Sequence, residues 1–315
     1  MKRLRDDRRG IIGVILALIV ILIVIIVVAA LLLIPFRSAP VEEHREAAIG
    51  TGVEALTLNL NIDVGNVTVR FVDDANVGVS LDVTGHHRSG LLGSQEPVNV
   101  SWNDRTVDDT LIVDANVTLG GSIIPFFSSD IACTLLVSNQ LRTALTISNG
   151  VGGLDVTASG VELTAMDLSV DTGGLRATMA DNVTLNGPLS MRATTGGVDL
   201  TWNNVVVGDN ASVALATTTG GVRATVTQTE GLGSNVTFTG EATTGGIDLT
   251  MNLEGNTSAR VTSTATLGGI SVQDRTGFNG TDGDLRSDNY ASDSNLETRL
   301  STNTGGVNLR LKYMA

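Results

Sequence analysis

A glycine-pair motif recurs along the second half of the chain at near-constant spacing. Each motif reads Thr or an apolar residue, then Gly-Gly, then an apolar–x–apolar run. The first glycines of the seven pairs, which we expect at structural corners, are Gly152, Gly173, Gly196, Gly220, Gly245, Gly268 and Gly305. The first six lie 21–25 residues apart, and the last interval is 37 residues. Repetition with a period of 20 to 50 residues is typical of solenoids and other stacked arrays.

The residues around each glycine pair predict β-strands. After the third pair, Val198 and Leu200 flank Asp199, and before it Leu189, Met191 and Ala193 fall on alternate positions. Apolar residues at every second position indicate half-buried strands, and the abundance of Thr, Val and Ile agrees with this. A Gly-Gly pair allows the positive φ angle of a tight corner.

Two all-β topologies fit this pattern: a meander of hairpins, or a β-solenoid with one Gly-Gly corner per coil. The outward residue after each of the first five pairs alternates in charge: Asp155, Arg176, Asp199, Arg223 and Asp248. Equivalent positions in adjacent coils stack about 4.7–4.9 Å apart, so a solenoid would bring these residues into a charge ladder. A meander gives them no reason to alternate, and chance is the remaining explanation. We therefore predict a β-solenoid of about seven or more coils with Gly-Gly corners.

The N-terminus predicts one transmembrane helix. Residues 1–10 form a basic head, and the uncharged apolar run from Ile11 to Ile34 is long enough, at about 36 Å, to cross a lipid bilayer. A cleaved signal peptide has a shorter apolar run, so we expect an uncleaved signal-anchor with a cytoplasmic N-terminus. The pair Arg9-Gly10 is also similar to the leader of archaeal type IV pilins, which makes a pilin-like filament subunit an alternative.

The remainder divides into a linker and one domain. Residues 35–50 contain two prolines and a charged run, which predicts a stalk. Residues 51–315 form the predicted extracytoplasmic solenoid. Residues 274–296 are rich in Asp, Ser, Asn and Gly and predict a loop inserted in one coil.

Charge and residue usage bear on location and partners. The chain has a net charge of −13, and since residues 1–10 carry +3, the remainder carries −16. Such an acidic domain is repelled by nucleic acid, so no nucleic-acid partner is expected. Lysine occurs at two positions, a bias that resembles proteins of salt-adapted archaea. The candidate N-glycosylation sites of an exported glycoprotein are Asn66, Asn99, Asn116, Asn182, Asn210, Asn235, Asn256 and Asn279.

Chemistry-bearing motifs are scarce. The single cysteine, Cys133, lies in an apolar run and is expected in the core, and the three histidines are His44, His86 and His87. No zinc, phosphate-loop or nucleophile-elbow motif occurs. Because an arginine coil separates each ladder aspartate from the next, we expect no catalytic residues, no cofactor and no enzyme activity. The weak metal candidates are Asp282, Asp284 and Asp288, whose spacing does not match an EF-hand.

The strand–Thr-Gly-Gly–apolar repeats from Val151 to Leu309, together with the entry segment from Leu58 to Val69, resemble the bacterial and archaeal "putative adhesin" family, which is related to toast-rack β-solenoid domains. This chain differs by a second glycine where the family often has Asp. The resemblance covers residues 51–315 and implies a β-solenoid at the cell surface, with no ligand or catalytic residues to transfer.

These observations predict a membrane-anchored cell-surface protein with a structural, adhesive or partner-binding role. The expected partner is an envelope protein or a glycan. The alternative is a membrane-tethered envelope sensor or regulator. A ten-residue head is too short for a signalling domain, so that alternative would need a membrane partner.

Overall fold

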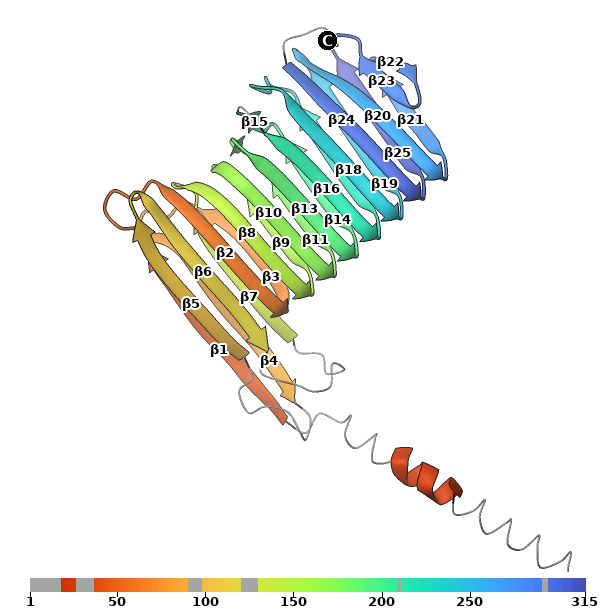
Figure 1. The fold of residues 1–315 in the computed structure, drawn as a ribbon. Helices are drawn as coiled ribbons and strands as arrows, with labels where there is room; N and C mark the ends of the chain where they lie inside the picture. The colour runs from red at the N-terminus through yellow and green to blue at the C-terminus, as the bar shows by residue number, and fades with distance from the viewer. Residues whose placement is uncertain (1–17, 27–36, 90–97, 120–129, 209–210, 291–293) are drawn as a thin grey trace, which may run out of the picture.

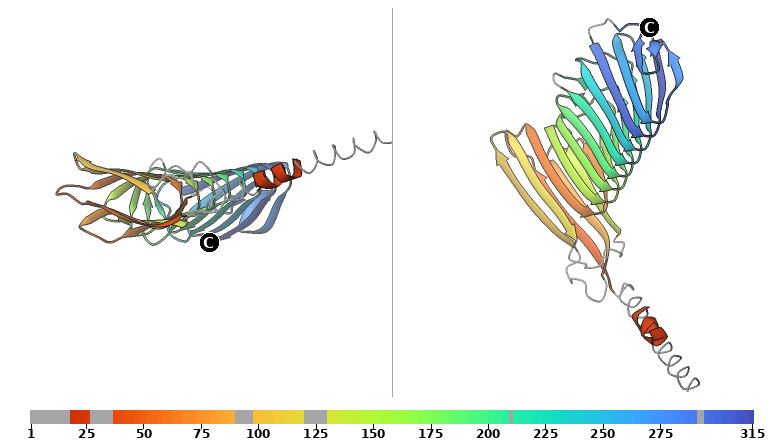
Figure 2. Two further views of the ribbon diagram at one scale, coloured as in Figure 1. Left: turned by 90° about the horizontal axis from the view of Figure 1, so that it is seen from below. Right: turned by 45° about the vertical axis from the view of Figure 1, so that its right-hand side comes forward.

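The computed structural model describes residues 18–26, 37–89, 98–119, 130–208, 211–290 and 294–315, and in these the fold is nearly all β. Two sheets face each other along the molecule (Figures 1 and 2). The order of the 11-stranded sheet is β1 (Arg37–Ala48), β4 (Val77–Ser89), β7 (Asp130–Ser138), β3 (Asn66–Val72), β9 (Leu154–Ala158), β11 (Leu175–Met179), β14 (Val198–Asn203), β17 (Val222–Gln228), β19 (Ile247–Glu254), β25 (Val307–Met314) and β21 (Ile270–Thr276).

The order of the 14-stranded sheet is β22 (Phe278–Thr281), β23 (Asp284–Ser287), β20 (Thr257–Leu267), β24 (Ser294–Thr304), β18 (Val236–Thr244), β16 (Ser212–Thr219), β13 (Pro188–Thr195), β10 (Glu162–Thr172), β8 (Arg142–Val151), β2 (Ala55–Val64), β6 (Thr110–Leu119) and β5 (Val98–Val107). Two short strands, β12 (Thr184–Leu185) and β15 (Val206–Val207), lie off this path beside β10.

Successive repeats stack as coils rather than as hairpins. Each coil places one strand in each sheet, and each strand pairs in parallel with the equivalent strand of the next coil. For example, β11 pairs with β9 on one side and β14 on the other, and β13 lies between β10 and β16. This pairing is the one expected of stacked coils, and the hairpin meander is wrong for these strands.

The first glycine of each pair is required by the coil spacing. Gly196 has a φ of +140°, and a Cβ added there would lie 1.7 Å from the carbonyl oxygen of Gly173 in the preceding coil. The amide of Gly196 donates a hydrogen bond of 2.8 Å to the carbonyl oxygen of Thr219, the residue before the glycine pair of the following coil. In spatial order the column of equivalent glycines is Gly65, Gly152, Gly173, Gly196, Gly220, Gly245, Gly305 and Gly268.

The core is a continuous stack of aliphatic side chains between the two sheets. Leu200, Leu215 and Leu168 are typical members, each at most 3% exposed. Trp202 is fully buried, meets Phe238 edge to face at 5.1 Å between ring centroids, and donates its indole N–H to Gln228 at 3.0 Å. Aliphatic residues suffice because parallel stacking places like side chains beside each other in every coil.

The coils do not stack in sequence order at the far end. The coil of β24 and β25, with Gly305 at its corner, lies between the coil of β18 and β19 and the coil of β20 and β21. The last part of the chain is thus inserted between two coils that precede it. At the near end, β2 similarly lies between β6 and β8.

Two segments differ from the sequence prediction. The predicted stalk at 35–50 contains β1, which pairs antiparallel with β4 along its whole length and forms an edge of the 11-stranded sheet. Its charged residues belong there because charges and proline protect an edge strand from adding further strands. The predicted loop at 274–296 contains the end of β21 and the hairpin β22–β23, whose buried Phe278 and Leu285 help to cover the end of the core.

The predicted membrane segment, Ile11 to Ile34, lies mostly outside the described residues. Residues 18–26 are helical, and their side chains from Leu18 to Ile26 are 47–60% exposed. Within the part of the chain that the structure describes, no helix has both the length and the apolar content to cross a membrane. The helix and the β22–β23 hairpin lie at opposite ends of the molecule (Figure 1).

Candidate functional site

A surface hollow of about 550 Å³ forms a groove that runs across the coils beside the Gly-Gly corners. Six coils contribute to it, and at the usual strand spacing this corresponds to a length of about 24 Å. Its lining residues are Asn66, Val67, Thr68, Gly153, Leu154, Asp155, Gly174, Leu175, Arg176, Gly197, Val198, Asp199, Gly221, Val222, Arg223 and Asp248. The groove therefore combines the second glycines with the predicted charge ladder.

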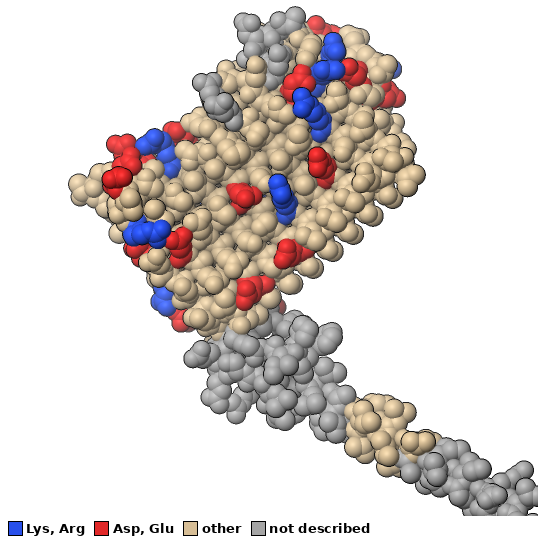
Figure 3. Space-filling view, in the orientation of Figure 1, with Lys and Arg blue, Asp and Glu red and all other residues tan. Residues whose placement is uncertain are grey.

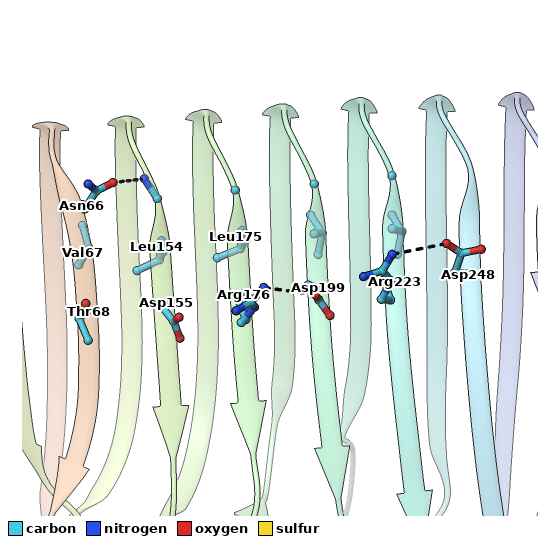
Figure 4. A pocket seen from close by; sticks show the side chains of 16 residues that line it. Asn66, Val67, Thr68, Leu154, Asp155, Leu175, Arg176, Asp199, Arg223 and Asp248 are labelled. Atoms are coloured by element: carbon cyan, nitrogen blue, oxygen red, sulfur yellow. Dashed lines mark hydrogen bonds and ion pairs between the residues drawn. The ribbon is translucent and has the colours of Figure 1, made fainter. Parts of the chain in front are cut away.

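The second glycine of a pair has more room than the first, and at Gly174 and Gly197 the backbone does not require glycine. A Cβ at Gly174 would meet nothing within 4 Å, and at Gly197 its nearest contact would be 3.6 Å away. In the first coil this position is Asn66, whose side-chain oxygen accepts the N–H of Gly153 at 2.9 Å (Figure 4). In the following coils a glycine replaces the asparagine, so the floor of the groove is bare backbone.

The predicted ladder residues lie in one row across neighbouring strands (Figure 4). Arg176 is in register with Asp155 on one side and Asp199 on the other. The row continues through Arg223 to Asp248 and ends on polar residues, Asn308 and Ser271.

The ion pairs in this row are long and partly formed. Arg176 Nη2 lies 3.8 Å from Asp199, and Arg223 Nη2 lies 4.0 Å from Asp248. Both arginines are more than 60% exposed. Exposed pairs of this kind contribute about 0–1 kcal/mol each. The row therefore balances charge along the groove more than it stabilises the stack, and its charged groups remain open to a ligand.

The three metal candidates do not converge. Asp284 accepts a bidentate pair of hydrogen bonds from Arg260 at 2.9 Å each, and this guanidinium lowers the pKa of the carboxyl. Asp282 faces Arg275 at 3.8 Å, and Asp288 accepts from Asn279. Among the described residues no group of three metal-ligating side chains comes together.

Other candidate residues have structural surroundings. His44, on β1, bonds through Nδ1 to Asp82 of β4 at 2.6 Å, which raises the pKa of the imidazole. His86 and His87 lie in β4 as well. Cys133 is buried in β7, and burial raises the pKa of its thiol to about 12.

The candidate glycosylation sites are distributed over turns and strands. Asn182 is exposed in the turn between β11 and β12, and Asn99 is exposed on the edge strand β5. Asn116 instead accepts a hydrogen bond from Asn61 in a second, smaller hollow of about 300 Å³ on the 14-stranded sheet. There Asp114 accepts from Asn59 and Arg105, which lowers its pKa. Asn235, Asn256 and Asn279 follow in the later coils, while Asn210 lies outside the described residues.

Sequence reasoning did not find the groove itself. The corner glycines and the ladder were visible as periodic positions, whereas Asn66 was considered as a glycosylation site. The signal for its role was present, because Gly65-Asn66-Val67 has the spacing of a corner motif with asparagine in place of the second glycine.

Comparisons with known proteins give two similar solved structures. One is a putative cell adhesion protein from Clostridium sporogenes, with a TM-score of 0.42 and 14% identity over 87% of this chain and 100% of that chain. The other is a putative adhesin from Bacteroides fragilis, with a TM-score of 0.30 and 11% identity over 87% of this chain and 98% of that chain. No protein-family model and no curated protein matches the sequence.

Proposed function

We propose that this chain is a membrane-anchored, cell-surface β-solenoid protein that binds an envelope protein or glycan and catalyses no reaction. The observation that carries the proposal is the groove along the Gly-Gly corners. It repeats the same backbone floor and alternating charge in successive coils, so it suits a polymer that lies along the stack.

The surroundings of the groove support binding. Among the described residues that line it there is no histidine, cysteine or lysine, and each ladder aspartate is separated from the next by an arginine. This arrangement offers hydrogen-bonding groups at regular intervals, and it keeps the carboxylates apart. The face of the 14-stranded sheet, which is not the face of the groove, has clusters of charged side chains at its two ends and a few acidic and basic ones across its middle (Figure 3).

The proposed anchor is the apolar run Ile11 to Ile34, with the N-terminus in the cytoplasm and residues 37–315 outside. Supporting this, the side chains of the helical residues 18–26 are all apolar and exposed, so they require an apolar environment. Protease added to intact cells should remove the β-domain and leave a small membrane fragment. Protection of the whole chain would contradict the location.

A groove-filling variant tests the binding site. Gly174→Trp places a large side chain on the floor at a position where a Cβ meets no atom within 4 Å. The matched control is Ser190→Trp, on the outer face of the other sheet. Binding of the full-length protein to cell-wall polysaccharide and to envelope protein should fall at least about tenfold for Gly174→Trp and stay unchanged for the control. Equal binding by the two variants would remove the groove from consideration.

A further inference from the structure

The end of the stack farthest from the N-terminal helix carries an unpaired edge, which we call the tip edge. It consists of residues 264–273, that is, the end of β20, the Gly268–Gly269 corner and the start of β21. Strand β21 is the last strand of its sheet in the described part of the chain. The β22–β23 hairpin, which covers the end of the core, pairs with β20 only from Arg260 to Thr262. The tip edge is therefore open in both sheets, on either side of a glycine corner.

The core is also incompletely covered at the tip edge. Ile270 and Val272 are half-buried, whereas their neighbours in the adjacent coil, Val307 and Leu309, are fully buried. Ala265 is also half-buried, whereas its neighbour in the adjacent coil, Thr302, is buried. At the corner itself Leu267 is 67% exposed, but Thr304 and Thr244, at the same position of the neighbouring coils, are exposed as well, so this exposure belongs to the corner and not to the open end. The tip thus presents core-facing side chains that every inner coil covers with another coil.

The tip edge carries no charge, although the chain as a whole has a net charge of −13. Its ten residues are uncharged, and the charges begin at Asp274 and Arg275, just after a bulge in β21. Edge strands are usually protected by charges, proline or bulges. At the opposite end of the same sheet, β1 has such protection, with Pro40 and four charged residues in 42–46. Within the tip edge the bulge after Val272 is the one such feature, and no charge or proline accompanies it.

The shape of the tip edge restricts what can cover it. A straight extended peptide can pair with one sheet or the other, because the edge bends at the glycine corner. A matching partner must have the same bend, the same spacing and no charge. A second copy of this chain meets all three conditions at its own tip edge.

We propose that two copies dock tip edge to tip edge about a two-fold axis through the Gly268–Gly269 corner. The axis places the end of β20 from one copy antiparallel to the start of β21 from the other. Ala265 then lies opposite Val272 of the second copy, and Leu267 lies opposite Ile270. Both open sheets gain a strand at once, and the exposed ends of the two cores meet.

Such a contact is small. Ten residues per copy fall below the standard interface of about 20–30 residues per side, so the association belongs to the weak, transient class. Many tethered copies would strengthen it through effective concentration. The docking is independent of the groove and of the membrane anchor. The role of this docking in joining copies of the protein on two cell surfaces rests on the proposed function.

Disulfide trapping tests the docking even when it is weak. Opposed residues of an antiparallel pair have Cα atoms about 4.5–5.5 Å apart, within disulfide range. The full-length double variant Ala265→Cys/Val272→Cys, in detergent micelles under mild oxidation, should become a disulfide-linked dimer. The control Ala265→Cys/Ile270→Cys, whose cysteines do not oppose each other, should stay mainly monomeric. The native Cys133 does not interfere because it is buried and its thiol pKa is raised to about 12.

A second measurement uses no cysteine. In sedimentation of the full-length protein, Val272→Asp should weaken self-association at least about tenfold, and Val100→Asp, at a half-buried valine of the opposite end, should not change it. Equal cross-linking of the two cysteine pairs, no cross-linking, or association insensitive to Val272→Asp would each overturn the proposal. Both experiments use purified protein, so they fail only if the docking is wrong, whereas protease treatment of cells tests the location.

Discussion

The two glycines of one corner should respond oppositely to the same substitution. Gly196→Ala puts a side chain on a residue with a φ of +140°, where its Cβ would lie 1.7 Å from the Gly173 carbonyl oxygen. Gly197→Ala adds the same methyl group one residue later, where the φ angle is ordinary and the nearest atom is 3.6 Å away. The pair is matched in size, sequence position and coil.

The magnitude follows from the backbone and the coil contacts. A side chain in this φ region costs about 1–3 kcal/mol. The overlap must also separate the two coils, which weakens the hydrogen bonds from Gly173 to Thr195 and from Leu175 to Gly197, each 2.9 Å long. Each such bond contributes about 0.5–1.5 kcal/mol, so Gly196→Ala should lose about 2–6 kcal/mol in all. Gly197→Ala should change stability by less than about 1 kcal/mol, and in the stabilising direction because alanine restricts the unfolded chain.

Denaturant unfolding of the full-length protein can measure both variants. Trp202, which is fully buried in the strand after this corner, provides a fluorescence signal that should shift to the red on unfolding. The midpoint should fall sharply for Gly196→Ala and remain or rise for Gly197→Ala. If the two variants lose equal stability, or if Gly196→Ala loses none, the close approach of adjacent coils is not what requires the first glycine.

Three further outcomes follow from the charged residues. Arg176→Asp should destabilise the protein by about 1 kcal/mol at low salt and less at high salt. Arg192→Asp, which has serine and alanine directly opposite and carboxylates only on the diagonal, should lose less stability at low salt in thermal melts. Arg260→Ala should lower the melting temperature more than Arg176→Ala, because it removes a bidentate pair; equal melting temperatures would contradict this. Because the pKa of His44 is raised in the folded protein, its bond to Asp82 stabilises β1 fully below pH 6.5, and this stabilisation is lost as pH rises through the folded pKa. Amide hydrogen exchange in β1 should therefore accelerate with pH more than the intrinsic exchange rate does. This additional acceleration should be absent in His44→Ala.

The prominence of Arg260 shows where sequence reasoning reached its limit. From the sequence, Arg260 is a surface arginine outside the ladder, and its reversal would be expected to matter less than that of Arg176. The contact geometry predicts the opposite order, because Arg260 donates two hydrogen bonds to Asp284 while Arg176 lies 3.8 Å from Asp199. Asp284 lies 24 residues away on the β22–β23 hairpin, and the polar composition of this segment predicts a loop. The Asp282-Gly283 pair, a common hairpin turn, was the available signal.

What the sequence could predict was set by periodicity. Alternating apolar residues define strands, and a glycine with positive φ defines each corner, so the register of the row from Asp155 to Asp248 follows directly. The same regularity makes it impossible to predict the order in which the coils stack. Because every coil offers an equivalent strand–corner–strand edge to its neighbours, the pattern does not say which coil lies beside which. The groove could not be predicted for a related reason: its floor is formed by the second glycines, and at Gly174 and Gly197 no backbone contact requires glycine.

The inserted coil has a consequence for how the far end is formed. Until residues 294–314 are made, the coil of β20 and β21 lacks the coil on which it stacks in the final structure, because β24 and β25 are its neighbours on that side in both sheets. Its earlier contact is the short pairing of β20 with β23. The available surface is then the coil of β18 and β19, whose strands have the same corner register: Thr244 and Leu267 both align with Thr304. Contacts between distant parts of the chain form slowly because loop closure precedes them. The tip edge is therefore completed last, and its shape depends on the strands that separate it from the rest of the stack.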